Sequence, residues 1–234
     1  QTLLSVAARS DEEEIVKLLL AREDINPEKS DLRDRTLLYI AAMYGKEGVA
    51  KLLLDRTDVN PEKPESDCQT PLFVTAQLGQ EVIVKLLLAQ DDLTAALMKD
   101  RDINHGDYLG NTPLIWAAKN GHEDAVKQLL EREDIDLNRL DHSGRSPLLW
   151  AASSGHEGVA ELLLKRQDMN PNTPDHWGRT PLQWAAASGH AGVLGKLLER
   201  QDINPNKPDR VGQTPLVCCA ALKHEGMIKL LVAR

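Results

Sequence analysis

The sequence predicts an all-α repeat solenoid, in which pairs of short helices stack in a row and connectors project from one edge. Two observations carry this prediction. A threonine or serine opens a similar segment every 34 residues along most of the chain, and each segment contains two helical patterns of apolar residues. The low aromatic content of 3% and the abundance of Leu and Ala also favour helices.

The repeat covers residues 1–234 as a single array. Its spacing is 34 residues except for one interval of 42, and this interval predicts an insertion near residues 90–100. Leu93, Ala96 and Leu97 in this segment have helical spacing, which predicts an added turn or a longer second helix. The pattern already includes Gln1, so we expect the sequence to be an excerpt of a longer chain. The seven repeat cores start at Thr2, Thr36, Thr70, Thr112, Ser146, Thr180 and Thr214.

Each unit contains start and stop signals for a first helix. In the fourth unit, the hydroxyl of Thr112 can cap exposed amides, Pro113 suits the first helical position, and Gly121 favours a left-handed stop. A second helix follows, with apolar residues three, four, seven and eight positions after its start. Connectors such as residues 202–213, "DINPNKPDRVGQ", are rich in Pro, Asn and Gly and so cannot continue the helix.

The segment "GNTPLIWAAKNGHEDAVKQLL", residues 110–130, resembles the ankyrin repeat, and the resemblance extends over all seven copies. It implies seven stacked helix pairs joined by β-hairpins or extended finger loops. The connectors, and a tryptophan shortly after Thr-Pro-Leu, are similar to those of fungal ankyrin arrays. These often follow a NACHT-type module in NLR-like receptor proteins, which implies a sensor region. Asp11 and Lys223 replace the stop glycine in the end copies, so the ends should be the least regular.

Trp116, Trp150 and Trp184 recur at one position that holds Ile40 or Val74 in other copies. Because apolar residues of any shape occupy this position, we expect the tryptophans to fill the core. Histidines also recur at one position, and their separation on different repeats favours a structural role over a shared metal site. These histidines are His122, His156, His190 and His224.

Composition restricts the remaining possibilities. The formal net charge of −8 and the absence of a basic cluster argue against nucleic acid as a partner. The apolar runs are too short to span a bilayer, so no membrane partner is expected. Cys218 and Cys219 should be buried and inert, whereas Cys68 lies in a connector. An odd number of cysteines favours an intracellular location, in the cytoplasm or nucleus.

The resemblance implies a non-catalytic scaffold, without cofactor or metal, that binds a protein partner through a concave groove and the finger tips. We expect the isolated fragment to be monomeric. The strongest aromatic candidates are Trp177, Tyr108 and Tyr44, and the alternative for each is a ring lying flat on a neighbouring finger. Two other hypotheses are an architectural array that self-associates through its end repeats and, less favoured, a metal-dependent hydrolase. The candidate partner-binding residues are Leu32, Arg33, Met43, Tyr44, Tyr108, Leu109, Lys119, Asn120, His142, His176, Trp177 and Arg210.

Overall fold

The computed structural model describes residues 3–22, 24–89 and 102–233. Thr2 and the expected insertion near residues 90–100 lie outside the described residues. The described part contains fourteen α-helices: α1 (Leu3–Arg9), α2 (Glu13–Leu20), α3 (Leu37–Met43), α4 (Glu47–Leu54), α5 (Pro71–Leu78), α6 (Glu81–Ala89), α8 (Pro113–Asn120), α9 (Glu123–Leu130), α10 (Pro147–Ser154), α11 (Glu157–Leu164), α12 (Pro181–Ser188), α13 (Ala191–Glu199), α14 (Pro215–Ala221) and α15 (Glu225–Val232).

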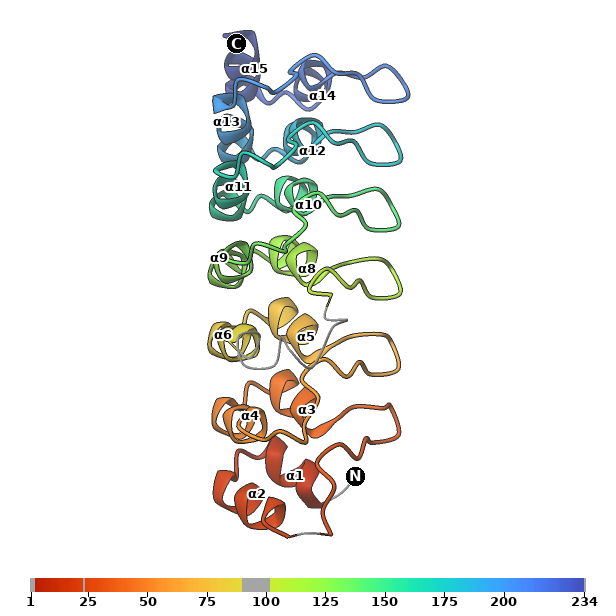
Figure 1. Ribbon diagram of the computed structural model, residues 1–234. Helices are drawn as coiled ribbons and strands as arrows, with labels where there is room; N and C mark the ends of the chain where they lie inside the picture. Colours follow the sequence, from red (N-terminus) through yellow and green to blue (C-terminus); the bar gives the residue numbers. More distant parts are fainter. Residues whose placement is uncertain (1–2, 23, 90–101, 234) are drawn as a thin grey trace.

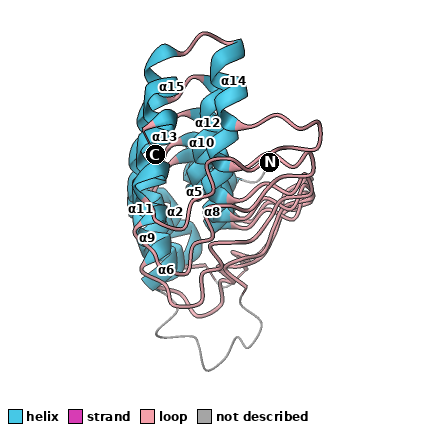
Figure 2. Cartoon of the chain, turned by 90° about the horizontal axis from the view of Figure 1, so that it is seen from above, coloured by secondary structure: helices cyan, strands magenta, loops and turns pink. Residues whose placement is uncertain are grey.

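The helices stack as two columns (Figure 1). Consecutive helices contact each other in pairs from α1 and α2 to α14 and α15, and each pair contacts the next pair along the chain. Helices α5 and α8 are also in contact, so the stack continues across the 42-residue interval. Viewed along the stack, the connectors project from the column of first helices, away from the second helices (Figure 2). This arrangement confirms the expected all-α repeat solenoid.

The predicted caps begin the first helices. The hydroxyl of Thr112 accepts a hydrogen bond from the amide of Ile115 at 3.2 Å, and Ser146 caps Leu149 in the same way. Thr36, Thr70, Thr180 and Thr214 also cap their helices, so a short polar side chain satisfies an exposed amide at each start.

Left-handed residues end the first helices. Gly121 has φ 77°, and the non-glycine residues Asp11 and Lys223 take the same region with φ of 64° and 58°. In these two end copies a residue with a side chain therefore takes the left-handed conformation that glycine takes elsewhere. Such a conformation costs about 1 kcal/mol in each of these two units.

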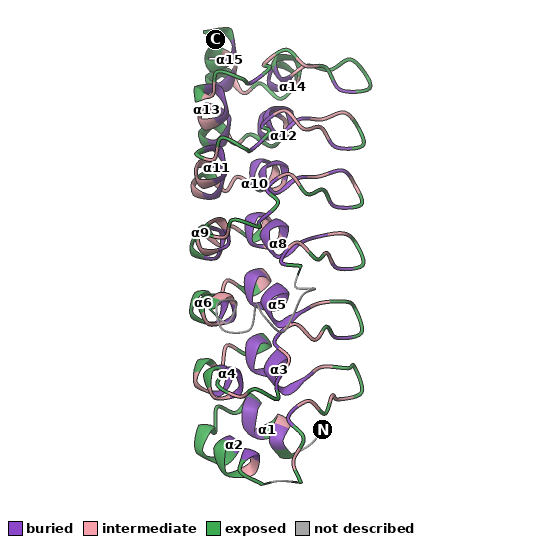
Figure 3. Cartoon of the chain, in the orientation of Figure 1, coloured by how far each residue is buried: buried purple, intermediate pink, exposed green. Residues whose placement is uncertain are grey.

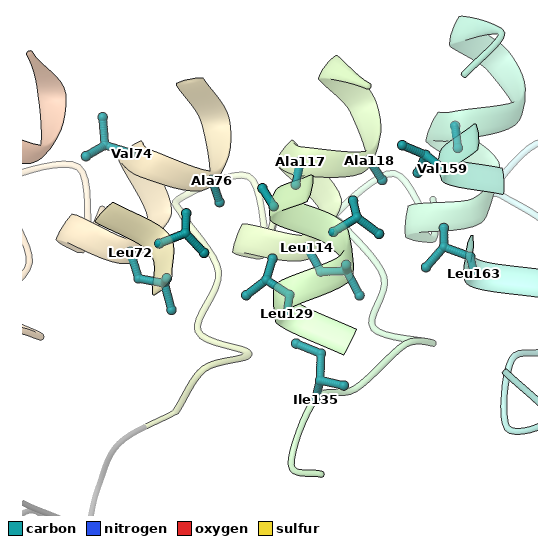
Figure 4. Packing of buried hydrophobic residues seen from close by; sticks show 14 of the residues in the cluster. Leu72, Val74, Ala76, Leu114, Ala117, Ala118, Leu129, Ile135, Val159 and Leu163 are labelled. Carbon is teal, nitrogen blue, oxygen red and sulfur yellow. The ribbon is translucent and has the colours of Figure 1, made fainter. Parts of the chain in front are cut away.

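Leucine, valine and alanine side chains fill the core between the two columns and between neighbouring pairs. Figure 4 shows Leu114 and Ala117 of α8 close to Leu129 of α9 and near Leu72 and Ala76 of α5. Each pair therefore buries its apolar surface against its neighbours as well as within itself. Burial is densest on the first helices, whereas the outer surfaces of the second helices are exposed (Figure 3).

The connectors, called fingers from here on, occupy residues 24–36, 55–70, 102–112, 131–146, 165–180 and 200–214. Within the described ranges no strand is present, so the fingers are extended loops and turns. The expected β-hairpins are not confirmed. Neighbouring fingers are joined by single backbone hydrogen bonds rather than by a ladder of them. The amide of His142, for example, donates to the carbonyl of Leu109 at 2.8 Å.

Asparagine side chains also link neighbouring connectors. Asn138 Nδ2 donates to the carbonyl of Asp168 at 2.8 Å, and its Oδ1 accepts from the amide of Asn170 at 2.9 Å. Asn104 and Asn172 form the same two bonds one unit away on either side. These pairs hold the bases of successive fingers at a fixed separation.

Candidate partner-binding surface

An aspartate shapes the turn of five of the described fingers, and Glu65 takes its place in the finger at residues 55–70. In the finger at residues 131–146, Asp141 Oδ1 accepts hydrogen bonds from the amides of Ser143 and Arg145, both at 2.8 Å. The amide of Asp141 also donates to the carbonyl of Arg145 at 3.0 Å. The carboxylate lies inside the turn and accepts hydrogen bonds from its amides, so the side chains of the tip residues point outward.

The structure places the predicted tip residues on the surface in a row. Backbone hydrogen bonds connect successive tips, including that from His176 N to Ser143 O at 3.1 Å and that from Arg210 N to Trp177 O at 3.1 Å. Trp177 keeps 50% of its surface exposed. The exposed tip residues are Leu32, Arg33, Tyr108, Leu109, His142, His176, Trp177 and Arg210.

The predicted residues on the first helices lie closer to the protein body. Tyr44 is exposed beneath the guanidinium of Arg9, which is 5.8 Å from the ring centroid, and Met43 is exposed beside it. Asn120 is exposed as well, but its amide already donates to the carbonyl of Gln77 at 2.8 Å. Lys119 is half-buried, with its ammonium 4.4 Å from the ring centroid of Trp116.

The expectation that the recurring tryptophans fill the core is wrong. Trp116, Trp150 and Trp184 are only partly buried. Each indole N–H donates to a finger aspartate nine residues earlier, as Trp150 Nε1 does to Asp141 Oδ2 at 3.0 Å. An indole ring has an apolar body and one hydrogen-bond donor, so it suits a position at the boundary between the core and a finger. The aliphatic residue Ile40, at the same position of another copy, has no donor and is only buried.

Cations lie over these rings. The Lys119 ammonium is 4.2 Å from the centroid of Trp150, and the Arg145 guanidinium is 4.3 Å from the same centroid. Arg145 also lies 5.6 Å from the ring centroid of Trp177. The tip residue Trp177 is therefore close to the cation of the preceding finger, which agrees in part with the alternative of a ring against a neighbouring finger.

This cluster of Trp150, Trp177, Lys119 and Arg145 was only partly visible in the sequence. Trp177 was predicted from its position at a finger tip and Lys119 from its position on a first helix. Arg145 and Trp150 were not predicted as surface residues of this cluster. Arg145 directly precedes the helix cap Ser146, and an Asp five residues before a cap together with Trp four residues after it would have been the signal.

The recurring histidines connect neighbouring repeats. His156 Nε2 lies 3.0 Å from the carbonyl oxygen of Lys119, and His122 Nε2 lies 3.0 Å from that of Gln77. His190 and His224 likewise approach carbonyl oxygens of the preceding unit. Each ring lies against the stop glycine of that unit, and these contacts support the expected structural role.

Cysteines and acidic residues offer no assembled reactive centre in the described part. Cys219 is fully buried and Cys218 half-buried, so the expectation of two buried thiols is correct only for Cys219. Burial raises the pKa of both thiols, which disfavours the reactive thiolate. Cys68 is exposed on a finger. No group of three or more His, Cys, Asp or Glu side chains that could hold a metal ion is found in residues 3–22, 24–89 and 102–233.

None of the described helices is long and apolar enough to cross a membrane.

A search of the curated proteins finds no match to this chain. The family model described as "Ankyrin repeats (3 copies)" matches residues 4–96, 89–175 and 165–234, which together cover nearly the whole sequence. With helix pairs, capping threonines and projecting fingers in register along the stack, the chain belongs to the ankyrin repeat family.

Proposed function

We propose that the protein is a non-catalytic scaffold that binds a protein partner along the finger tips and the adjoining side of the first helices. Ankyrin repeats are generally protein-interaction modules, which supports this role. The observation that carries the proposal is the row of exposed tip side chains held in register by backbone hydrogen bonds between fingers. A surface fixed before binding loses less conformational entropy when a partner docks.

Large aromatic residues should contribute most to this interface. Trp177 and Tyr108 are exposed on different fingers, and such residues dominate the binding energy of many interfaces. The count of seven repeats and the similarity to the arrays of fungal NACHT- and NLR-like receptors stay predictions.

Affinity capture from a native cell extract tests the proposal. We expect the double variant Trp177→Ala, Tyr108→Ala to lose partners that the unaltered protein retains. The matched control is Asp124→Ala, Lys127→Ala, which changes two exposed residues of the second-column helix α9. Equal retention by the unaltered protein and the tip variant would reject this surface, and circular dichroism checks that both variants fold.

End-to-end self-association is a second candidate, favoured by apolar residues at the last helix pair. Leu182 of α12 is fully buried by the following unit, whereas the equivalent Leu216 of α14 is 37% exposed. Val217 beside it is exposed as well. Light scattering should then show growth with concentration that Val217→Lys abolishes, and a constant monomer mass would reject this candidate.

A further inference from the structure

The finger aspartates have different partners in different repeats. In the finger at residues 24–36, Asp31 Oδ2 accepts from Arg35 Nε at 2.9 Å and Nη2 at 2.6 Å. The residue at the tryptophan position of this repeat is Ile40, which has no donor to compete. Arg35 is thus neutralised by a carboxylate of its own finger, and this pair lowers the pKa of Asp31.

A tryptophan changes that pairing. Asp141 and Arg145 form the same turn as Asp31 and Arg35, with the same backbone hydrogen bond from Asp N to Arg O. Here Asp141 Oδ2 accepts from the indole of Trp150 instead. In the described part of the chain, the Arg145 side chain has no hydrogen bond or ion pair, and its Nε is buried without a partner.

In the next finger, the arginine does not pair with the aspartate of its own finger but lies near the aspartate of the following finger. Trp184 Nε1 occupies Asp175 Oδ2 at 2.9 Å, and Arg179 is left beside the Trp184 ring. Position 218 in the following repeat is a cysteine, so no indole donates to Asp209, and Arg179 Nε lies 3.8 Å from Asp209 Oδ2. No corresponding contact between Arg145 and Asp175 is found among the described residues, and Asp175 Oδ2 accepts from the Trp184 indole.

A second cation stands next to Arg145. The Lys119 ammonium lies between the rings of Trp116 and Trp150. No ion pair of Lys119 is found among the described residues. Arg145 and Lys119 therefore place two positive charges around one indole in a protein whose formal net charge is −8. A ring face stabilises a cation by about 0.5–2 kcal/mol but does not neutralise it.

We propose that Arg145 and Lys119, framed by Trp116, Trp150 and Trp177, receive the carboxylate side chains of an acidic segment in the partner protein. This inference rests on the proposed function, and it names the partner's chemistry. A guanidinium binds a carboxylate through two parallel N–H donors, and the ring framework holds that fork in place. Two cations are too few for a nucleic-acid backbone, whose binding requires many phosphate contacts.

Two fluorescein-labelled nonapeptides provide the probes. One alternates Glu with Gly and Leu, and the other has Gln at every Glu position. We expect the Glu peptide to raise fluorescence anisotropy and to shift the NMR signals of the Arg145 Nε–H and the Trp150 indole, while the Gln peptide does neither. Arg145→Gln should weaken binding about tenfold, as loss of a charged hydrogen-bonded pair does.

Trp150→Phe is the decisive variant. It keeps an aromatic ring but removes the donor to Asp141, so Arg145 can return to that carboxylate as Arg35 does with Asp31. We expect the Arg145 Nε–H signal to move without peptide, and binding of the Glu peptide to weaken about fivefold. The matched control is Tyr39→Phe, which removes an aromatic hydrogen-bond donor outside this site, the hydroxyl that donates to Gln69 Oε1, and its affinity for the Glu peptide should change less than about twofold.

Equal binding of the Glu and Gln peptides, or unchanged binding by Trp150→Phe, would overturn the inference. A phosphoserine peptide that binds far more tightly than the Glu peptide would also overturn it, since the occupant would then be a phosphate. If extract proteins are lost from the Trp177→Ala, Tyr108→Ala variant while the Glu peptide fails to bind, the proposed function stands and only the acidic-segment inference fails.

Discussion

Tyr39 lies buried in α3, where its hydroxyl donates to Gln69 Oε1 of the following finger at 3.1 Å. Burial raises the pKa of Tyr39 to about 12, because the phenolate would lose its hydration. An unfolded tyrosine ionises near pH 10. The stabilisation from keeping Tyr39 neutral is therefore complete below pH 10 and is lost as the pH rises towards 12.

Tyr39→Phe should remove this pH dependence. Between pH 10 and pH 12, we expect the free energy of unfolding of the unaltered protein to fall by about 2 kcal/mol more than that of the variant. Urea unfolding at the two pH values measures the difference, since the lysines titrate alike in both proteins. Tyr108→Phe, at an exposed tip, is the control, and equal pH dependence in all three proteins would contradict the assignment.

Among the elements, the stop glycines of α5, α8, α10 and α12 each lie against a histidine that precedes the second helix of the next unit. Gly155 ends α10 with φ 79°, and a Cβ added there would lie 2.5 Å from Nδ1 of His190. His190 in turn lies 3.2 Å from the Ser153 carbonyl through Nε2. One glycine thus satisfies a left-handed turn and leaves space for a ring from the neighbouring repeat.

Gly155→Ala should destabilise the protein by about 2–3 kcal/mol, combining backbone strain with displacement of the His190 ring. Gly212→Ala is the matched control, because Gly212 has φ 82° but no atom within 4 Å of an added Cβ, and only the strain of about 1 kcal/mol should remain. Chemical denaturation of Gly155→Ala in a His190→Ala background tests the coupling. Strict additivity of the two changes would show that the ring contact contributes nothing.

Local signals predicted these helix ends well, and long-range contacts account for what was missed. The Thr112 cap and the Gly121 stop depend on backbone geometry within a few residues, so sequence alone places them. The tryptophans needed more information, since the half-burial of Trp150 depends on a hydrogen bond to Asp141 in a finger. The sequence pattern showed that Trp, Ile and Val alternate at this position, but not that the indole changes the pairing of Arg145.

At the scale of the whole molecule, stability should vary along the stack. Inner pairs are covered on two sides and the end pairs on one, which matches the extra exposure of Leu216. Stacked repeats follow nearest-neighbour energetics. We therefore expect amide hydrogen exchange to be fastest in α1, α2, α14 and α15 and slowest in α8 to α12.

A buried substitution in the centre tests how far coupling extends. Leu163 of α11 is fully buried, and Leu163→Ala should lower protection by about 2–5 kcal/mol in α10 to α13, with smaller changes in α1 to α4. Leu18→Ala, at an exposed site, should change protection by less than about 0.5 kcal/mol. A uniform drop along the chain after Leu163→Ala would instead indicate a single cooperative unit.

The asparagine links between finger bases have a mechanical consequence. Among the described residues, each link joins adjacent units and the main helix contacts also lie within or between adjacent pairs, so tension applied at the two ends is carried from one unit to the next. When the molecule is stretched, the outer pairs should peel away first and the rest should follow one at a time. A force–extension trace would then show a series of small rips, and the protein would act as an extensible spring rather than a rigid strut.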